Sequence, residues 1–219
     1  MISNLIIILI AYTLGSLPFG FAISKLFSGK NVLEIGWRKS SGSNVFKNVG
    51  KWQGVLTGIL DIGKGFLAVW LSQKLGFSPQ IQAFCGVAAI TGHNWSCFLN
   101  FSGGRGIGTF GGALLALSPQ IFWISLIPIA VVAFVWNAST GTILSLITAI
   151  VLSFYFNQLE STGLFAFLSL IPIFIKRLSP LKEISFSKKE IIRNRLIFDD
   201  DIPRWDLRIK RIISKLTKR

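Results

Sequence analysis

The sequence predicts an all-α integral membrane protein with about seven transmembrane helices. Of its 219 residues, 51% are hydrophobic and 15% are charged. Several apolar runs reach about 20 residues, the length of helix that crosses the hydrocarbon core of a bilayer. These runs are continuous rather than alternating, which argues against a strand-based barrel. The 23 Lys and Arg residues are concentrated in two segments, as is typical of loops on the positive side of a membrane.

Seven hydrophobic segments are expected to form a membrane domain at residues 1–177. Gly15 and Pro18 interrupt the first segment, and Pro128 lies in the fifth. The fourth and sixth segments are short and contain glycine or serine, so we expect them to be broken or buried inside the bundle. The seven segments are Ile6–Leu26, Gln53–Leu71, Ile81–Leu99, Gly106–Leu117, Ile121–Trp136, Ile143–Phe156 and Leu164–Ile175.

The distribution of positive charge predicts the topology. Residues 25–51 carry six Lys or Arg, and residues 176–219 carry fourteen. Placing both in the cytoplasm requires an odd number of spans, which seven or five satisfy with the N-terminus outside. With seven spans, every polar cluster faces the cytoplasm, which predicts a single active face. Lys74 is then the one loop charge on the outer side of the membrane. The first span lacks the features of a cleaved signal peptide, so we expect it to be retained.

Charge and cysteine content exclude several classes of function. In so apolar a chain the net charge of +14 reports topology, and we expect no nucleic-acid partner. Cys85 and Cys97 are separated by about 18 Å along a helix, which is too far for a disulfide, so both are expected to be small buried apolar residues. With one histidine and no C-x-x-C spacing, no metal is expected.

The stretch Gly92–Gly106 is the most informative about function. It places the only histidine, His93, together with Asn94 and a glycine-rich turn around Arg105, between two apolar segments. Polar groups at membrane depth are costly and usually functional. Glycines let backbone N–H groups surround an anion, and arginine binds phosphate through two parallel hydrogen bonds. The stretch therefore predicts a phosphate site, and tight helix packing by glycine is the alternative.

Two other motifs bear on anion binding. Residues 106–111 match G-x-G-x-x-G, but no strand precedes them, so dinucleotide binding is excluded, while the N–H groups at this helix start still suit a phosphate. Residues 37–47 alternate cations with hydroxyl groups around a glycine, which predicts either a phosphate cradle or merely a positive-inside loop. The candidate ligands of this cradle are Lys39, Ser40, Ser41, Ser43, Asn44 and Lys47.

The charged groups of the second span leave two interpretations open. Asp61 and Lys64 are three residues apart on one helix face and can pair. Because an unpaired charge at membrane depth costs several kcal/mol, they are either a structural buried pair or part of the site.

The basic tail, residues 178–219, is expected to be cytoplasmic. Arg204–Lys218 has an apolar stripe flanked by cations, which predicts an interfacial amphipathic helix on anionic headgroups, the alternative being a solvated tail. Asp199–Asp201 precede this helix and are expected to favour its N-terminus.

The polar residues point to chemistry on an activated substrate. No Ser-His-Asp spacing or pair of carboxylates indicates a protein nucleophile. Phosphate binders with few acid–base groups suit an acyl phosphate, whose phosphate is a good leaving group, with an alcohol positioned against its carbonyl.

These motifs resemble those of a family, the bacterial inner-membrane acyl-phosphate:glycerol-3-phosphate acyltransferases. Gly92–Thr109 resembles its G-H-x-(F/W)-x-x-F-L-x-F-x-G-G-K-G motif, and Gly15–Gly20 its G-S-x-P-x-(A/G). Asn44–Gly50 with Asp61–Gly65 resembles N-V-x-R-x-x-G followed by D-x-x-K-G. The order and spacing agree over nearly the N-terminal half.

The chain also departs from the family pattern. Trp37 replaces an early serine of the first motif, and Thr142 an arginine near Ser145 in the sixth span. The third motif, N-I-x-R-L-x-x-G-x-E, aligns on residues 192–201, where Arg195 and Leu196 are kept and Asp201 replaces the glutamate. The other replacements are Ser43 for threonine, Lys47 for arginine and Arg105 for lysine.

The resemblance implies acyl transfer from acyl phosphate to the 1-hydroxyl of glycerol-3-phosphate, with no cofactor and no metal. It implies a multi-pass protein of the inner membrane, which we expect to be a monomer in contact with the lipid bilayer. A transporter or lipid-binding paralogue with the same phosphate site is the alternative. Catalytic roles are expected for Ser43, His93 and Arg105. Substrate-binding roles are expected for Lys39, Ser40, Ser41, Asn44, Lys47, Asn94, Gly103, Gly104, Gly106, Ser145 and Arg195.

Overall fold

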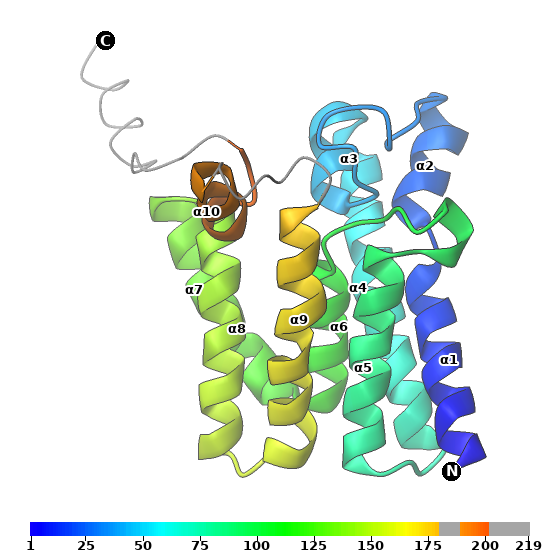
Figure 1. Ribbon diagram of the computed structural model, residues 1–219, viewed down its shortest axis with the longest axis vertical. Coiled ribbons are helices and arrows are strands. Elements are labelled where there is room, and N and C mark those ends of the chain that lie inside the picture. The colour runs from blue at the N-terminus through cyan, green and yellow to red at the C-terminus, as the bar shows by residue number, and fades with distance from the viewer. Residues whose placement is uncertain (180–188, 202–219) are drawn as a thin grey trace.

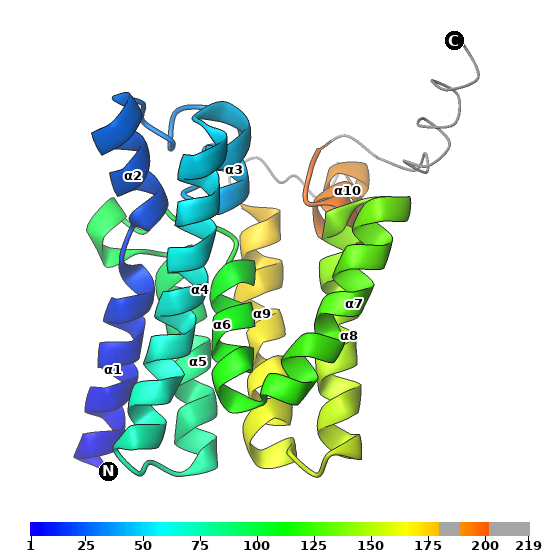
Figure 2. The same cartoon turned by 180° about the vertical axis from the view of Figure 1, so that it is seen from behind.

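The computed structural model describes residues 1–179 and 189–201, and every regular element in those ranges is helical. Eight helices build an upright bundle, in which α2 continues the direction of α1 (Figures 1 and 2). Two short helices, α3 and α10, lie at the end of the bundle opposite the N-terminus. The bundle helices are α1 (Ile2–Ser16), α2 (Phe19–Ser28), α4 (Lys51–Lys74), α5 (Pro79–Asn94), α6 (Ile107–Leu117), α7 (Pro119–Val135), α8 (Ala138–Tyr155) and α9 (Leu164–Leu178). The short elements are α3 (Gly42–Asn48), α10 (Lys189–Phe198), a 3-10 turn at Cys97–Leu99 and a π-helical turn at Leu159–Gly163.

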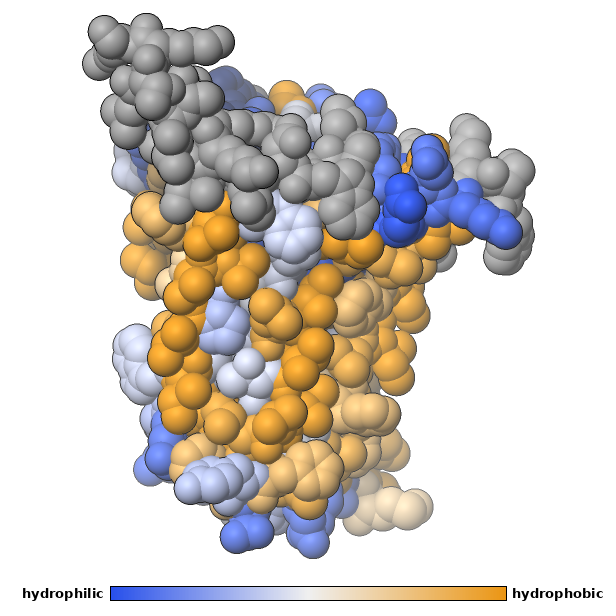
Figure 3. Space-filling view, turned by 90° about the vertical axis from the view of Figure 1, so that its left-hand side faces the viewer, coloured by the Kyte–Doolittle hydropathy of each residue, from blue (hydrophilic) through white to orange (hydrophobic). Residues whose placement is uncertain are grey.

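The described helices are those of a multi-pass membrane protein. Four segments are long and apolar enough to cross a bilayer: Ile2–Ser28, Lys51–Lys74, Ala138–Tyr155 and Leu159–Leu178. Ile107–Leu117 and Pro119–Val135 are shorter apolar helices. On the face that Figure 3 shows, a broad apolar region covers the middle of the bundle and polar residues lie below it and at its upper edge, as a lipid environment favours.

Each of the seven predicted hydrophobic segments is helical, with three differences from expectation. The sixth was expected to be broken or buried inside the bundle, but α8 is continuous and only 28% of its span is buried. Pro18 separates α1 from α2, as predicted, whereas Pro128 lies inside an uninterrupted α7. The third segment was expected to reach Leu99, but α5 ends at Asn94. The chain turns there because Trp95 is held by α1: its carbonyl accepts a hydrogen bond of 2.7 Å from the Tyr12 hydroxyl.

Cys97 also differs from expectation. It lies in the 3-10 turn after α5 and is exposed, whereas Cys85 is buried within α5 as predicted. The early end of α5 explains the difference, because residues after Asn94 leave the helical core.

Small residues set the distance between the central helices. A Cβ atom at Gly65 of α4 would strike the Thr109 backbone of α6, and one at Gly112 of α6 would strike the Ile62 backbone of α4. Such close approach is typical of helix pairs in membranes. It fixes α6, and with it the loop that precedes α6, against α4.

The polar segments gather at one end of the bundle. The loop 29–41, α3, the loop 95–106 and α10 all lie at the end opposite the N-terminus (Figures 1 and 2). The polar clusters therefore gather at one end, as predicted, and the assignment of that end to the cytoplasm stays a prediction. Arg204–Lys218, for which an amphipathic helix is predicted, lies outside the described residues.

Candidate active site

Two cavities meet at Arg105 at the polar end of the bundle. The first, about 640 Å³, is bordered by Phe46, Val55 and Ile107 and contains His93. The second, about 690 Å³, is strongly basic. The cations that line the second cavity are Arg38, Lys39, Arg105, Lys176, Arg177 and Arg195. The residues that line both are Trp37, Arg105, Arg177, Asp199 and Asp200, so the two cavities share one wall.

The glycine-rich turn folds back over His93 and so carries Arg105 to that shared wall. The Gly104 amide donates a hydrogen bond of 3.0 Å to the His93 carbonyl, and a Cβ atom at Gly104 would strike the imidazole ring. Gly106 has φ of +77°, a left-handed conformation that favours glycine. The glycines are thus needed for the turn to cover His93 this closely.

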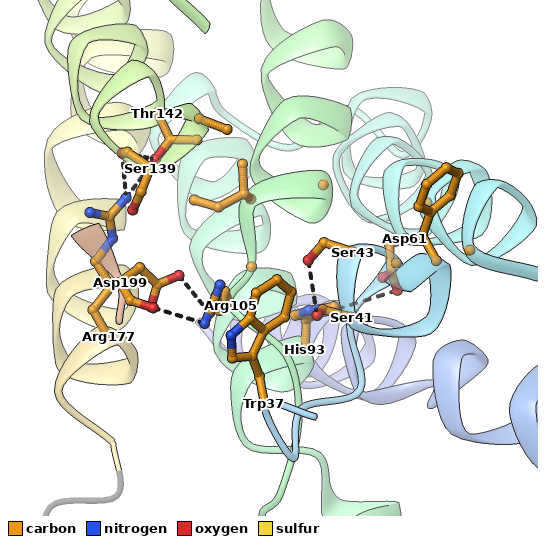
Figure 4. A pocket seen from close by; sticks show the side chains of 18 of the residues that line it. Trp37, Ser41, Ser43, Asp61, His93, Arg105, Ser139, Thr142, Arg177 and Asp199 are labelled. Carbon is orange, nitrogen blue, oxygen red and sulfur yellow. Dashed lines mark hydrogen bonds and ion pairs between the residues drawn. The ribbon is translucent and has the colours of Figure 1, made fainter. Parts of the chain in front are cut away.

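Arg105 is held by an aromatic ring and a carboxylate. Its guanidinium lies over Trp37, 5.1 Å from the ring centroid, in the geometry of a cation–π contact. Its Nε is 2.5 Å from Asp199 Oδ2, and its terminal NH2 donates to the Asp199 carbonyl at 3.0 Å (Figure 4). Neither contact of Arg105, with Trp37 or with Asp199, was predicted from the sequence.

His93 belongs to a buried charged cluster. Asp61 Oδ1 lies 3.4 Å from His93 Nδ1 and 3.1 Å from Lys64 Nζ, and the three side chains are at most 6% exposed. Lys64 also donates 2.9 Å to the Leu17 carbonyl, beside the break between α1 and α2. Asp61 and His93 both line the first cavity. The two interpretations of Asp61 from the sequence, a buried pair with Lys64 and a place in the candidate site, therefore both apply. The contact of Asp61 with Nδ1 orients the imidazole.

Eight of the fourteen predicted site residues line the cavities. Ser41 and Ser43, whose hydroxyl oxygens are 3.4 Å apart, face the first cavity together with His93 (Figure 4). Lys39 and Arg195 face the second. The eight are Lys39, Ser41, Ser43, His93, Gly103, Arg105, Gly106 and Arg195.

Two predicted ligands instead hold the protein chain itself. Asn44 is fully buried, and its amide nitrogen donates to the carbonyls of Val32, Ile35 and Lys39. Asn94 is likewise fully buried and donates 2.8 Å to the Pro172 carbonyl. Asn44 shapes the loop that presents Trp37 and Lys39, which corrects its expected contact with substrate.

Four further predicted residues lie outside both cavities. The Ser40 hydroxyl accepts a hydrogen bond of 3.1 Å from the Phe21 amide. The Lys47 ammonium lies over the face of Trp37, 4.9 Å from its centroid. Ser145 is buried in α8, and Gly104 packs on His93. None of these four residues borders either cavity. They pack against residues of the site and do not line the space that a substrate would fill.

Comparisons with known proteins identify the family of this chain. The family model described as glycerol-3-phosphate acyltransferase matches residues 5–185. The chain belongs to this family.

Relatives of the family match over most of their length. Glycerol-3-phosphate acyltransferase 2 of Moorella thermoacetica is 37% identical over 166 residues, 75% of this chain and 85% of that protein. Glycerol-3-phosphate acyltransferase 4 of Dehalococcoides mccartyi is 33% identical over 207 residues, 90% and 89% of the two chains. A crystal structure of PlsY, an integral membrane glycerol 3-phosphate acyltransferase in its glycerol 3-phosphate form, superposes with a TM-score of 0.71 at 28% identity, covering 82% of this chain and 90% of that one.

Within this acyltransferase fold, Arg177 stands beside the position where the family pattern has an arginine. Thr142 of α8 replaces that arginine, and Arg177 of α9 donates 2.5 Å to its hydroxyl and 3.0 Å to the Ser139 carbonyl. Arg177 also donates 2.7 Å to the Leu196 carbonyl near the end of α10. A guanidinium thus reaches both cavities from a different helix, which the sequence alone did not indicate.

Burial and charge set the electrostatics of the second cavity of this acyltransferase. Burial and the neighbouring Arg105 lower the pKa of Lys39 from its usual 10.5 to about 8, against the opposing pull of Asp199. Burial also raises the pKa of Asp199, although Arg105 and Lys39 oppose that shift. A hydrogen bond from Arg195 lowers the pKa of Asp201. Asp199 and Asp201 therefore pair with site cations. Their expected role at the start of a tail helix stays a prediction, because that segment lies outside the described residues.

The described residues offer no cluster of three or more His, Cys, Asp or Glu side chains that would hold a metal ion.

Proposed function

We propose that this chain transfers a fatty acyl group from acyl phosphate to the 1-hydroxyl of glycerol-3-phosphate, releasing lysophosphatidic acid and phosphate. The main support for this proposal is the position of Arg105. It lies between a cavity that has apolar walls and contains His93 and a cavity that is lined by cations. An acyl phosphate has one apolar arm and one phosphate, and glycerol-3-phosphate adds a second phosphate. Two joined cavities of these characters suit that pair of substrates.

The acyl chain enters the first cavity from the lipid side. Phe46 and Val55 line this cavity and are 47% and 53% exposed. A chain already dissolved in the bilayer therefore reaches the cavity without crossing water. The phosphates bind at the opposite side of Arg105, to Lys39, Arg177 and Arg195, where guanidinium groups match phosphate geometry.

The nucleophile is the substrate hydroxyl. It attacks the acyl carbonyl carbon, the carbon–oxygen bond to phosphate breaks, and the hydroxyl proton passes through His93 to the leaving phosphate. Asp61 holds the imidazole at Nδ1, so Nε2, which packs against Gly104 of the turn, is the atom left to take the proton. Ser43 and Gly106 line the first cavity, where negative charge develops on the carbonyl oxygen, and are the candidates to stabilise it.

The membrane arrangement is part of the proposal. Residues 1–177 form a monomeric domain of seven spans in the bacterial inner membrane, with the N-terminus outside and the polar end in the cytoplasm. Supporting this, the polar end carries the basic loop 29–41 and the cations of α9 and α10. Residues 178–219 form the cytoplasmic tail. A cysteine at position 210 should react with a membrane-impermeant reagent only after the cytoplasmic side is exposed, and labelling from outside intact cells contradicts this orientation.

The central experiment measures turnover. The purified protein in detergent should release phosphate and form lysophosphatidic acid from acyl phosphate and glycerol-3-phosphate, and acyl-coenzyme A should not replace acyl phosphate. Folded wild-type protein without turnover contradicts the proposal.

Arg105 should be essential to that turnover. Arg105→Ala should lower kcat/KM by about 100-fold or more, because a charge that stabilises the transition state is lost. Lys74→Ala, which removes a cation at the opposite end of the bundle, is the matched control and should leave the rate unchanged. Full activity of Arg105→Ala removes Arg105 from the mechanism.

A further inference from the structure

Asp199 places a carboxylate on the cations of the second cavity. Its Oδ2 is 2.5 Å from Arg105 Nε, its Oδ1 is 3.8 Å from Lys39 Nζ, and its side chain is 8% exposed. Figure 4 shows the carboxylate pointing at Arg105 from the segment that follows α10. An acidic group from the protein itself therefore lies where the proposed function requires a substrate phosphate.

The carboxylate satisfies this position incompletely. Asp199 Oδ1 is buried, and within the described residues it forms the 3.8 Å ion pair with Lys39 but accepts no hydrogen bond. A buried acceptor that lacks a hydrogen bond is costly, so this contact is weaker than the number of nearby cations suggests. A phosphate group brings more charge and more acceptor oxygens, and it would satisfy Lys39 and Arg105 more fully.

The backbone at Asp199 is one that glycine adopts more easily. Asp199 has φ of +54°, in the left-handed region, and its amide donates 3.0 Å to the Arg195 carbonyl to close α10. Glycine is the usual residue at such a helix end. The third motif of the family, aligned on residues 192–201, has glycine at this position. The chain thus keeps the turn and adds a carboxylate to it.

We propose that Asp199 is an internal competitor for the phosphate site, which substrate phosphate must displace from Arg105 and Lys39. The proposal rests on the proposed function of this cavity as the phosphate site. Because binding must first displace Asp199, the affinity of the site is lower for every phosphate ligand, including the phosphate products. Asp199 therefore sets how tightly the site binds phosphate and helps phosphate products to leave.

The test measures binding of inorganic phosphate by calorimetry in detergent, so it does not depend on turnover. If the carboxylate vacates the cations in about a tenth of wild-type molecules, Asp199→Asn and Asp199→Gly should each lower the dissociation constant for phosphate about tenfold. Both variants should fold, because asparagine and glycine tolerate the left-handed backbone. Glu190→Gln removes a carboxylate that is 86% exposed on α10 and should leave phosphate binding unchanged.

The outcomes separate the two proposals. Weaker or unchanged phosphate binding in both Asp199 variants overturns the competitor role and makes Asp199 a support for Arg105. The same effect from Glu190→Gln also overturns it, since net charge alone would then be the cause. A wild-type protein that binds phosphate but forms no lysophosphatidic acid contradicts the proposed function and leaves the competitor role to be decided by the variants. Hydrogen exchange gives a second readout: saturating phosphate should speed exchange at residues 196–201 in wild type but not in Asp199→Gly, and unchanged exchange in wild type overturns displacement.

Discussion

Two clusters in this protein each place an aspartate between a lysine and a second nitrogen-bearing side chain, but they are built on different elements. Asp61 lies between Lys64 and His93, and Asp199 lies between Lys39 and Arg105. The first cluster joins α4 to α5, two helices of the packed bundle. The second joins residues outside the helices: two loops and the turn after α10. We expect a buried carboxylate to keep its partners when rigid helices carry the whole cluster, and to exchange them for a ligand when loops carry it.

The largest effect is expected from breaking the Asp61 cluster. Asp61→Asn should lower the rate of acyl transfer by about 10³- to 10⁴-fold, because a neutralised acid no longer orients the histidine. It should also lower the free energy of unfolding by about 3 kcal/mol, since Lys64 is left buried and unpaired. Steady-state rates and thermal unfolding in detergent measure both.

The controls for Asp61 test the comparison itself. Glu160→Gln neutralises an exposed carboxylate that is bonded to Gln80 at the other end of the bundle, and it should change neither quantity. Asp199→Asn should leave the melting temperature close to that of wild type. If Asp61→Asn keeps a tenth of the wild-type rate, or if Asp199→Asn destabilises the protein as strongly, the contrast between the clusters is wrong.

A smaller effect is expected at Arg177, beside the exchangeable cluster. Arg177→Gln removes a charge and its hydrogen bonds to Thr142 and Ser139, and should raise the KM for glycerol-3-phosphate about tenfold or more. The KM of Arg177→Lys should lie between those of wild type and Arg177→Gln, because lysine keeps the charge but not the planar geometry. Arg193→Gln, on the exposed side of α10, is the matched control. An unchanged KM in Arg177→Gln shows that Arg177 only ties α9 to α8.

The smallest effect is a pH dependence from Lys39. Because the pKa of Lys39 is lowered to about 8, its charge is present below pH 8 and is lost as the pH rises through that value. The kcat/KM for glycerol-3-phosphate should therefore decline above pH 8 in wild type. In Lys39→Arg the decline should disappear, since arginine stays charged. The same decline in both proteins assigns the titration to another group.

The sequence predicted the features that depend on neighbouring residues. Each of the seven apolar runs lies on described helices, because hydrophobicity along a run is a local property. The glycine turn before α6 was also identified, since Gly103–Gly106 combine the needed freedom with an arginine in four consecutive positions. The single polar face followed from the charge count of the loops.

Contacts between distant residues were not predictable in the same way. Arg105 meets the Asp199 carbonyl across 94 positions, and Arg177 meets Thr142 across 35. The sequence also could not tell which polar side chains face inward: Asn44 sits in the predicted cradle but turns to the backbone of its own loop. Residue type gives hydrogen-bonding capacity, and only the packing of helices decides where that capacity is used.

The depth of Asp61 has a consequence for how the substrates arrive. Asp61 lies ten residues into α4, about 15 Å from its start at Lys51. The first cavity therefore descends well below the rim of the bundle, while the second stays at the rim. In the proposed reaction the acyl donor can arrive by lateral diffusion within the membrane. The acceptor, glycerol-3-phosphate, arrives by diffusion through the aqueous solution. The local donor concentration is then set by the composition of the membrane, whereas that of the acceptor follows the concentration in solution.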